Sequence, residues 1–206
     1  MAIAKSSGGS FEPVPQGTHQ ARCFAQISLG TQHSDNFPDS FKVMLMWELP
    51  EQTIEKEGES FPMVIHKEYT CSLNEKATLR RDLVSWRGRE FTEVELSGFD
   101  VSQVIGAPCL LNVIQTQSAK GKTYSKIAGI SPLPKKMQAD KQVHASVKYE
   151  IEMGKGLVFQ KLPDWVQKKI CACVEWTQPQ VRPPAPTPSS HMPADDTQSE
   201  TDDVPF

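Results

Sequence analysis

The stretch QARCFAQISL at positions 20–29 alternates strictly along the chain. Ala21, Cys23, Ala25, Ile27 and Leu29 fall on one face, and Gln20, Arg22, Phe24, Gln26 and Ser28 fall on the other. A period of two with one mainly apolar face predicts a half-buried β-strand. The rest of the chain must then supply the partners that cover the apolar face of this strand.

Four more strands are predicted at Phe41–Leu49, from Phe61 to about Ser72, at Cys109–Gln115 and at Thr123–Ile130. The charged stretch Glu51–Ser60 is predicted to be a loop, and the last two strands are predicted to form a hairpin around Ser118–Lys122. Between the third and fourth strands the period changes. Leu79, Leu83 and Trp86 fall at i, i+4 and i+7, which predicts an amphipathic helix ended by Gly88.

The predicted order is therefore strand, strand, strand, helix, strand, strand. Five strands with a helix between the third and the fourth is the order of the OB-fold, a small and partly open Greek-key barrel. We expect a mainly β protein with this barrel, although another small antiparallel barrel or sandwich would fit the same pattern. A further helix is predicted over Leu162–Ile170, with Pro163 in its first turn, to dock on the barrel or on a partner.

Charge and proline content divide the chain. The net charge is -3, but residues 177–206 carry five acidic residues against one basic residue, which leaves the first 176 residues at +1. Seven of the 16 prolines lie in the same last thirty residues, and large apolar residues are scarce there. We expect a flexible leader at 1–15, the barrel at 16–134, an extension with a helix at 135–176, and a disordered Pro-rich linker with an acidic tip at 177–206.

Sequence patterns of catalytic or metal sites are missing. The chain has no phosphate-binding glycine loop, no HExxH and no GxSxG. Its five cysteines are dispersed and odd in number, which favours reduced, mostly buried thiols over a zinc site or disulfides. We therefore expect a protein that is not an enzyme and has no cofactor and no metal. No stretch reaches the ~18 apolar residues of a spanning helix, and no secretory signal is recognisable, so the expected location is the cytoplasm.

A basic and aromatic hairpin is the main positive signal. Between 101 and 148 there are seven lysines and one acidic residue. Lys122, Tyr124 and Lys126 share one face of the last predicted strand, and Lys120 lies in the turn before it. Lysines neutralise phosphates, while an aromatic ring stacks on an unpaired base of any sequence. The pattern predicts binding of single strands; the alternative is a solvated lysine edge with Tyr124 half-buried.

Further candidates for contact with DNA are less specific. They are Arg22 and Phe24 on the polar face of the first strand, Phe37 and Lys42 around the first loop, and Arg80 and Arg87 on the predicted helix. The two helix arginines belong to a basic cluster that could instead pair with neighbouring acidic residues. Trp47, Trp86 and Phe99 are predicted to lie in the core.

The chain ends Asp202-Asp203-Val204-Pro205-Phe206. This ending resembles the acidic tip of bacterial and phage single-stranded DNA-binding proteins, in which several aspartates precede an aliphatic residue, a proline and a terminal phenylalanine. The body between 17 and 134 resembles a phage-encoded family of OB-fold single-stranded DNA-binding proteins. The similar stretches include Trp47–Pro50, Leu79–Leu83, Ser85–Gly88 and Gly121–Tyr124.

The resemblance implies sequence-tolerant binding of single-stranded DNA in phage replication or recombination, inside an infected bacterial cell. The tip would recruit other replication or recombination proteins: Phe206 would enter a small apolar pocket, and Asp202 and Asp203 would steer it to a basic rim. An OB-fold module that binds proteins without DNA is the main alternative, and a nuclease is a weaker one. No membrane partner is expected. A homo-oligomer is compatible with this sequence.

Overall fold

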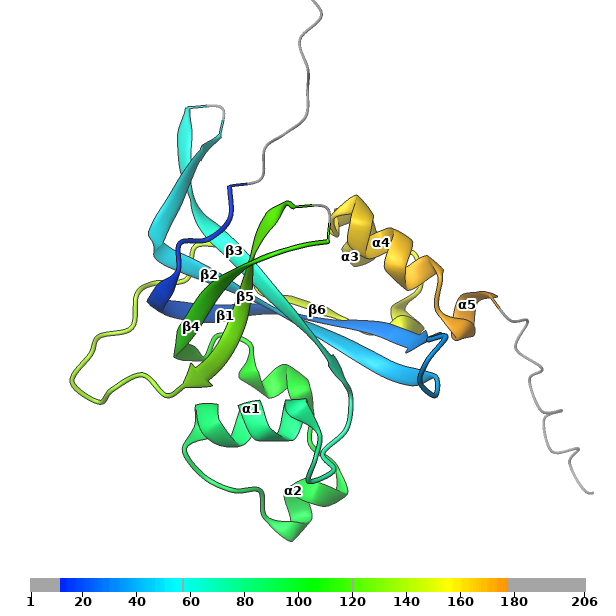
Figure 1. Ribbon diagram of the computed structural model, residues 1–206. Coiled ribbons are helices and arrows are strands. Elements are labelled where there is room, and N and C mark those ends of the chain that lie inside the picture. Colours follow the sequence, from blue (N-terminus) through cyan, green and yellow to red (C-terminus); the bar gives the residue numbers. More distant parts are fainter. Residues whose placement is uncertain (1–11, 57, 120, 178–206) are drawn as a thin grey trace, which may run out of the picture.

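The computed structural model describes residues 12–56, 58–119 and 121–177 (Figure 1). Its strands are β1 (Gly17–Gln32), β2 (Ser40–Lys56), β3 (Glu59–Thr70), β4 (Pro108–Gln117), β5 (Thr123–Ser131) and β6 (Val147–Tyr149). Between β3 and β4 lie α1 (Thr78–Arg87), α2 (Glu93–Ser97) and the 3-10 turn η1 (Val101–Val104). After β6 come the 3-10 turn η2 (Ile151–Met153), α3 (Leu157–Lys161), α4 (Asp164–Cys171) and α5 (Val174–Thr177).

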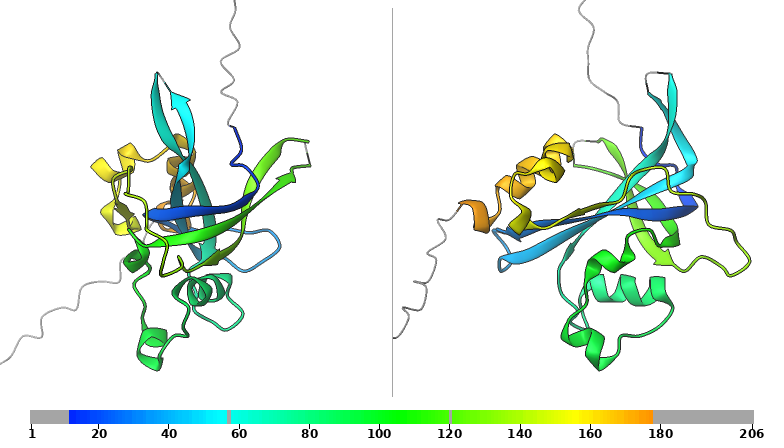
Figure 2. Two further views of the ribbon diagram at one scale, coloured as in Figure 1. Left: turned by 90° about the vertical axis from the view of Figure 1, so that its left-hand side faces the viewer. Right: turned by 180° about the vertical axis from the view of Figure 1, so that it is seen from behind.

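The first five strands form one antiparallel sheet in the order β3-β2-β1-β4-β5. β1 is central because its second half pairs with β2, whereas its first half, Gly17–Arg22, pairs with β4. The edge strands β3 and β5 approach each other, so the sheet curls into a half-barrel (Figures 1 and 2). The mainly β, five-stranded sheet predicted from the sequence is thus confirmed.

One core lies between the sheet and α1. The helix has buried Leu79, Leu83 and Trp86 in it, which are the residues at the predicted i, i+4 and i+7 positions. The Trp86 ring lies 5.9 Å from the ring of Trp47 on β2, measured between centroids. These large side chains fill the interior of the half-barrel, so it is a packed core and not an open channel.

A second core lies on the opposite face of β1 and β2. A β-bulge between Cys23 and Ala25 shifts the register of β1, so that Ala21 and Cys23 belong to the first core while Ala25, Ile27 and Leu29 belong to the second. A bulge adds one residue and thereby reverses the direction of every side chain beyond it. The prediction of one apolar face and a half-buried strand is therefore wrong, because both faces of β1 are covered.

Residues 147–177 supply the cover of this second core (Figure 2). β6 pairs parallel with β1 at Ala25–Ile27, and α3 and α4 contribute buried Phe159, Val166 and Ile170. The predicted helix is α4, which begins after Pro163 as its N-cap. The extension therefore docks on the barrel.

The segment before β6 is attached to β2 through one buried carboxylate. Glu48 is fully buried, and its two oxygens accept hydrogen bonds from the backbone N–H of Val143 at 2.8 Å and of His144 at 2.7 Å. The Nδ1 atom of His144 lies 2.7 Å from the same carboxylate. A buried carboxylate held by several hydrogen bonds fixes the path of the returning chain.

Three further boundaries differ from the prediction. β2 and β3 continue through most of Glu51–Ser60, because a register irregularity between Leu49 and Thr53 absorbs Pro50. The short helix α2 was not predicted, although Thr92 and Glu95 form a capping box at its start. Val14, which the sequence places in the leader, is only 2% exposed and belongs to the first core.

Candidate nucleic-acid interface

The β4–β5 hairpin presents two different faces. Val113 and Ile127 point into the first core, and next to them Gln115 and Ser125 donate hydrogen bonds to the backbone carbonyl of Val14. The alternate residues point outward. On this outer face Thr116 lies opposite Tyr124, and Ile114 lies opposite Lys126.

The outer face of the hairpin exposes an aromatic and an aliphatic side chain together. Tyr124 is 46% exposed and Ile114 is 40% exposed, so the ring has open surface on which a flat group can stack. Lys122 and Lys126 are exposed on either side of Tyr124. Neither lysine forms an ion pair with any residue that the structure describes. The predicted grouping of Lys122, Tyr124 and Lys126 is therefore present, while Lys120 lies outside the described residues.

Arg22 and Phe24 do not belong to this surface. The Arg22 guanidinium donates to the backbone carbonyls of Gly106 and Asp140, with Nη2 at 2.6 Å from the Asp140 oxygen. Phe24 is 7% exposed and stacks on His144, with ring centroids 4.9 Å apart. Their expected contact with DNA is corrected, because Arg22 supports two connecting loops and Phe24 belongs to the second core.

Phe37 lies in the loop between β1 and β2, and Lys42 lies just after that loop, in β2. Phe37 is 75% exposed in that loop, whereas Lys42 lies in β2, half-buried, opposite Gly30 and Thr70. The left view of Figure 2 shows this loop and the β4–β5 hairpin projecting toward the same side of the molecule. Phe37 is thus available to a ligand, but at a separate projection from Tyr124.

Arg80 and Arg87 lie on α1 and are engaged with neighbours. Arg80 donates to the carbonyl of Leu73 at 3.3 Å, with Glu90 at 3.9 Å. Arg87 pairs with Glu95, and its guanidinium lies over the Phe91 ring at 4.4 Å from the centroid. The side chain of Arg87 is only 16% exposed, so its expected role in contacting DNA is corrected to a structural one.

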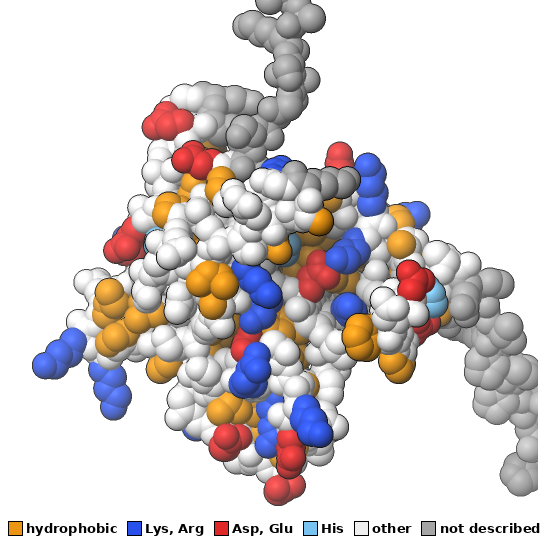
Figure 3. All heavy atoms as spheres, viewed as in Figure 1, with side chains coloured by type: hydrophobic (Ala, Val, Ile, Leu, Met, Phe, Trp, Pro, Cys, Tyr) orange, Lys and Arg blue, Asp and Glu red, His pale blue; other side chains and the backbone are white. Residues whose placement is uncertain are grey.

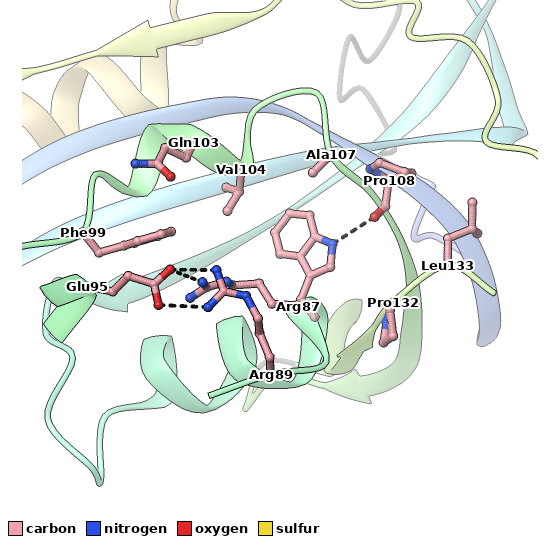
Figure 4. A pocket seen from close by; sticks show the side chains of 11 residues that line it. Arg87, Arg89, Glu95, Phe99, Gln103, Val104, Ala107, Pro108, Pro132 and Leu133 are labelled. Carbon is pink, nitrogen blue, oxygen red and sulfur yellow. Dashed lines mark hydrogen bonds and ion pairs between the residues drawn. The ribbon is translucent and has the colours of Figure 1, made fainter. Parts of the chain in front are cut away.

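Arg87 also lines a pocket of about 400 Å³ between α1, α2, η1 and the residues after β5 (Figure 4). Its apolar lining comes from Trp86, Phe99, Val104, Ala107, Pro108, Pro132 and Leu133. Arg89 donates to both oxygens of Glu95, and this pairing, with a backbone hydrogen bond from Thr92, lowers the pKa of Glu95 to about 2. Both arginines therefore pair with the Glu95 carboxylate, and the rest of the pocket lining is mainly apolar.

The remaining sequence predictions concern other features. The tip residues Asp202, Asp203, Val204, Pro205 and Phe206 lie outside the described residues. Within the described residues the cysteines are unpaired, and burial raises the pKa of the Cys23 thiol to about 12. No group of three or more His, Cys, Asp or Glu residues in the described ranges could hold a metal ion. None of the described helices has both the length and the apolar character to cross a membrane.

Sequence reasoning missed one exposed aromatic pair. Trp165 at the start of α4 is 44% exposed, and its ring lies 4.7 Å from that of His66 on β3. The strand pattern does place His66 among the outward residues of its strand. The partner ring comes from a distant helix, however, so no local pattern could bring the two together.

Comparison of the sequence with protein-family models and with curated proteins finds no match, and comparison of the structure with solved structures finds none either.

Proposed function

We propose that this protein binds single-stranded DNA without sequence preference, through an OB-type barrel. The single observation that carries the proposal is the outer face of the β4–β5 hairpin, where the exposed Tyr124 ring lies between two lysines that pair with no described residue. Stacking on a ring and neutralisation of phosphates are the two interactions that hold unpaired strands in sequence-tolerant binders. A duplex offers phosphates but no free base faces, so the ring favours single strands.

The topology supports an OB-type barrel. β1 pairs with both β2 and β4, β3 approaches β5, and α1 lies between β3 and β4 in the chain. In barrels of this type the loop between the first two strands and the loop between the last two flank the ligand. Here the first of these loops contains Phe37 and the second contains Lys122. Both residues are therefore placed where such barrels bind their ligand, which supports the proposal.

The biological setting follows from the sequence resemblance and is part of the proposal. The protein would act in phage DNA replication or recombination inside an infected bacterial cell, without catalysing a reaction. The acidic segment ending at Phe206 would recruit replication or recombination proteins through its aspartates and its aromatic side chain.

The test is an anisotropy titration with labelled oligo(dT) and with a duplex of equal length, at about 50 and 200 mM salt. We expect tight binding to oligo(dT), weaker binding to the duplex, and a loss of affinity as salt rises. Equal binding to both forms, or affinity for oligo(dT) that does not change with salt, would contradict the proposal.

A second candidate function is a protein-binding module, and the apolar pocket beside α1 favours it. The lining of this pocket is mainly apolar, and its arginines already pair with Glu95. It therefore suits an apolar peptide side chain better than a phosphate. Substitution of Leu133 by Asp at the pocket would then abolish partner binding and leave oligo(dT) binding unchanged.

A further inference from the structure

We infer that Trp165 is a second stacking platform for the same single strand, which would cross the outer face of β3 between the β4–β5 hairpin and α4. The inference rests on the proposed function and adds the C-terminal extension to the binding surface. It is carried by the juxtaposition of Trp165 and His66 and by the open side of the indole ring.

The exposure of Trp165 is not needed to dock α4. Val166 and Ile170 are fully buried in the second core and attach the helix to the sheet. The Nζ atom of Lys169 lies 2.6 Å from a carboxylate oxygen of Glu68 on β3 and ties the helix to β3 beside Trp165 and His66. Because these contacts already hold α4, nearly half of the surface of Trp165 can stay in water without loosening the helix.

The indole is held in one orientation by a flat partner. The His66 ring lies 4.7 Å away with an interplanar angle of 37°, on the outer face of β3. Burial, the largest cause, lowers the pKa of His66; Glu68 raises this pKa and Lys169 lowers it, and the net shift is downward, which favours the neutral ring. An indole fixed against a neutral ring loses little freedom when a base stacks on it, which favours binding.

The charges near Trp165 are mixed, because Asp164 directly precedes it and Glu68 pairs with Lys169, but two exposed lysines are available to a phosphate backbone. Lys168 lies three residues further along α4, so the two side chains are neighbours on the helix surface. Lys168 and Lys161 are exposed, and neither pairs with an acidic residue in the part of the chain that the structure describes. An aromatic ring beside exposed lysines that have no partner among the described residues repeats the arrangement around Tyr124.

The two aromatic sites lie on either side of β3. In the left view of Figure 2 the hairpin projects to one side of β3 and α3 and α4 lie on the other. Figure 3 shows basic side chains, with acidic side chains among them, around the area between the hairpin and the α4 region. A single strand that contacts Tyr124 and crosses β3 at His66 would reach Trp165, whose ring lies against that of His66.

Tryptophan fluorescence during titration with oligo(dT) tests the inference. We expect binding to quench the emission of the wild-type protein, and Trp165→Phe to remove most of this quenching while oligo(dT) affinity changes by less than about threefold, since phenylalanine still stacks. Trp165→Ala should weaken binding about tenfold, the weaker end of the effect of losing one stacked base. Trp176→Phe, in the neighbouring helix α5, is the matched control and should keep the quenching.

The outcomes separate the two proposals. If Trp165→Ala binds oligo(dT) as tightly as the wild type while Tyr124→Ala is weakened, the inference is wrong and the proposed function stands. If the wild-type protein does not bind oligo(dT), both are wrong. Should Trp165→Ala fail to fold, as judged by thermal melting, Trp165→Phe decides: quenching that persists in this variant overturns the inference.

Discussion

Replacing both Lys122 and Lys126 by glutamine removes two exposed positive charges from the hairpin and leaves Tyr124 in place. Each lysine that neutralises a phosphate of a single strand contributes about 0.7 to the slope of log affinity against log salt concentration. Neither lysine is paired with a described acidic residue, so both charges are available to the strand. The double variant should therefore have a slope shallower by about 1.4.

Over a fourfold change in salt, from about 50 to 200 mM, that difference amounts to about sevenfold in affinity. Anisotropy titrations with labelled oligo(dT) at four or more salt concentrations measure the slope directly. Lys76→Gln is the matched control, because it removes one exposed lysine from the connection before α1. An unchanged slope in the double variant, or an equal change in the control, would refute the assignment of the hairpin as the phosphate-binding surface.

Three further predictions concern stability. Asp82→Asn removes the charged partner of Lys67 on β3, whose Nζ atom lies 2.6 Å from the Asp82 carboxylate. The substitution should lower the free energy of unfolding by about 3 kcal/mol, measured by urea titration, and an unshifted midpoint would contradict this. Gly30→Ala adds a Cβ atom only 2.7 Å from Cys173 at φ +71°, so it should destabilise the protein more than Gly106→Ala, which has φ +84° and no described atom in reach; equal melting temperatures would count against the close packing of the turn between α4 and α5 on β1. Burial opposes ionisation of Glu175, but hydrogen bonds from β1 outweigh it and hold its pKa below 4.5, so the docking of α5 should be complete above that pH and weaken as the pH falls through the lowered value; Glu175→Gln should remove this pH dependence from the tryptophan emission.

Sequence patterns predicted the elements that depend on local order. The helix α1 and the β4–β5 hairpin follow from periodicity alone, because Leu79, Leu83 and Ile127 bury the faces that their spacing indicates. The outward direction of Tyr124 follows from the same alternation.

Errors arose where distant segments decide the environment of a residue. Arg22 is polar and alternates outward, but its partners are carbonyls 84 and 118 residues further along the chain. Phe24 is buried because a bulge turns the strand and a later segment covers it. Arg87 pairs with Glu95 in a helix of five residues, which is too short to produce a periodic signal. For Arg22 and Phe24 no local pattern carries this information, and for α2 the capping box of Thr92 and Glu95 is the one local signal.

The second core has a consequence for any attempt to isolate the five-stranded half-barrel without residues 135–177. A protein truncated after residue 134 would lack β6 and α3–α5, and would uncover Ile27, Leu29, Met44 and Met46 on the sheet. Exposed apolar patches of this kind promote self-association. The sheet and the segment up to Thr177 should therefore be expressed, purified and crystallised as one piece. Binding measured with a protein shortened to residue 134 would be dominated by its self-association.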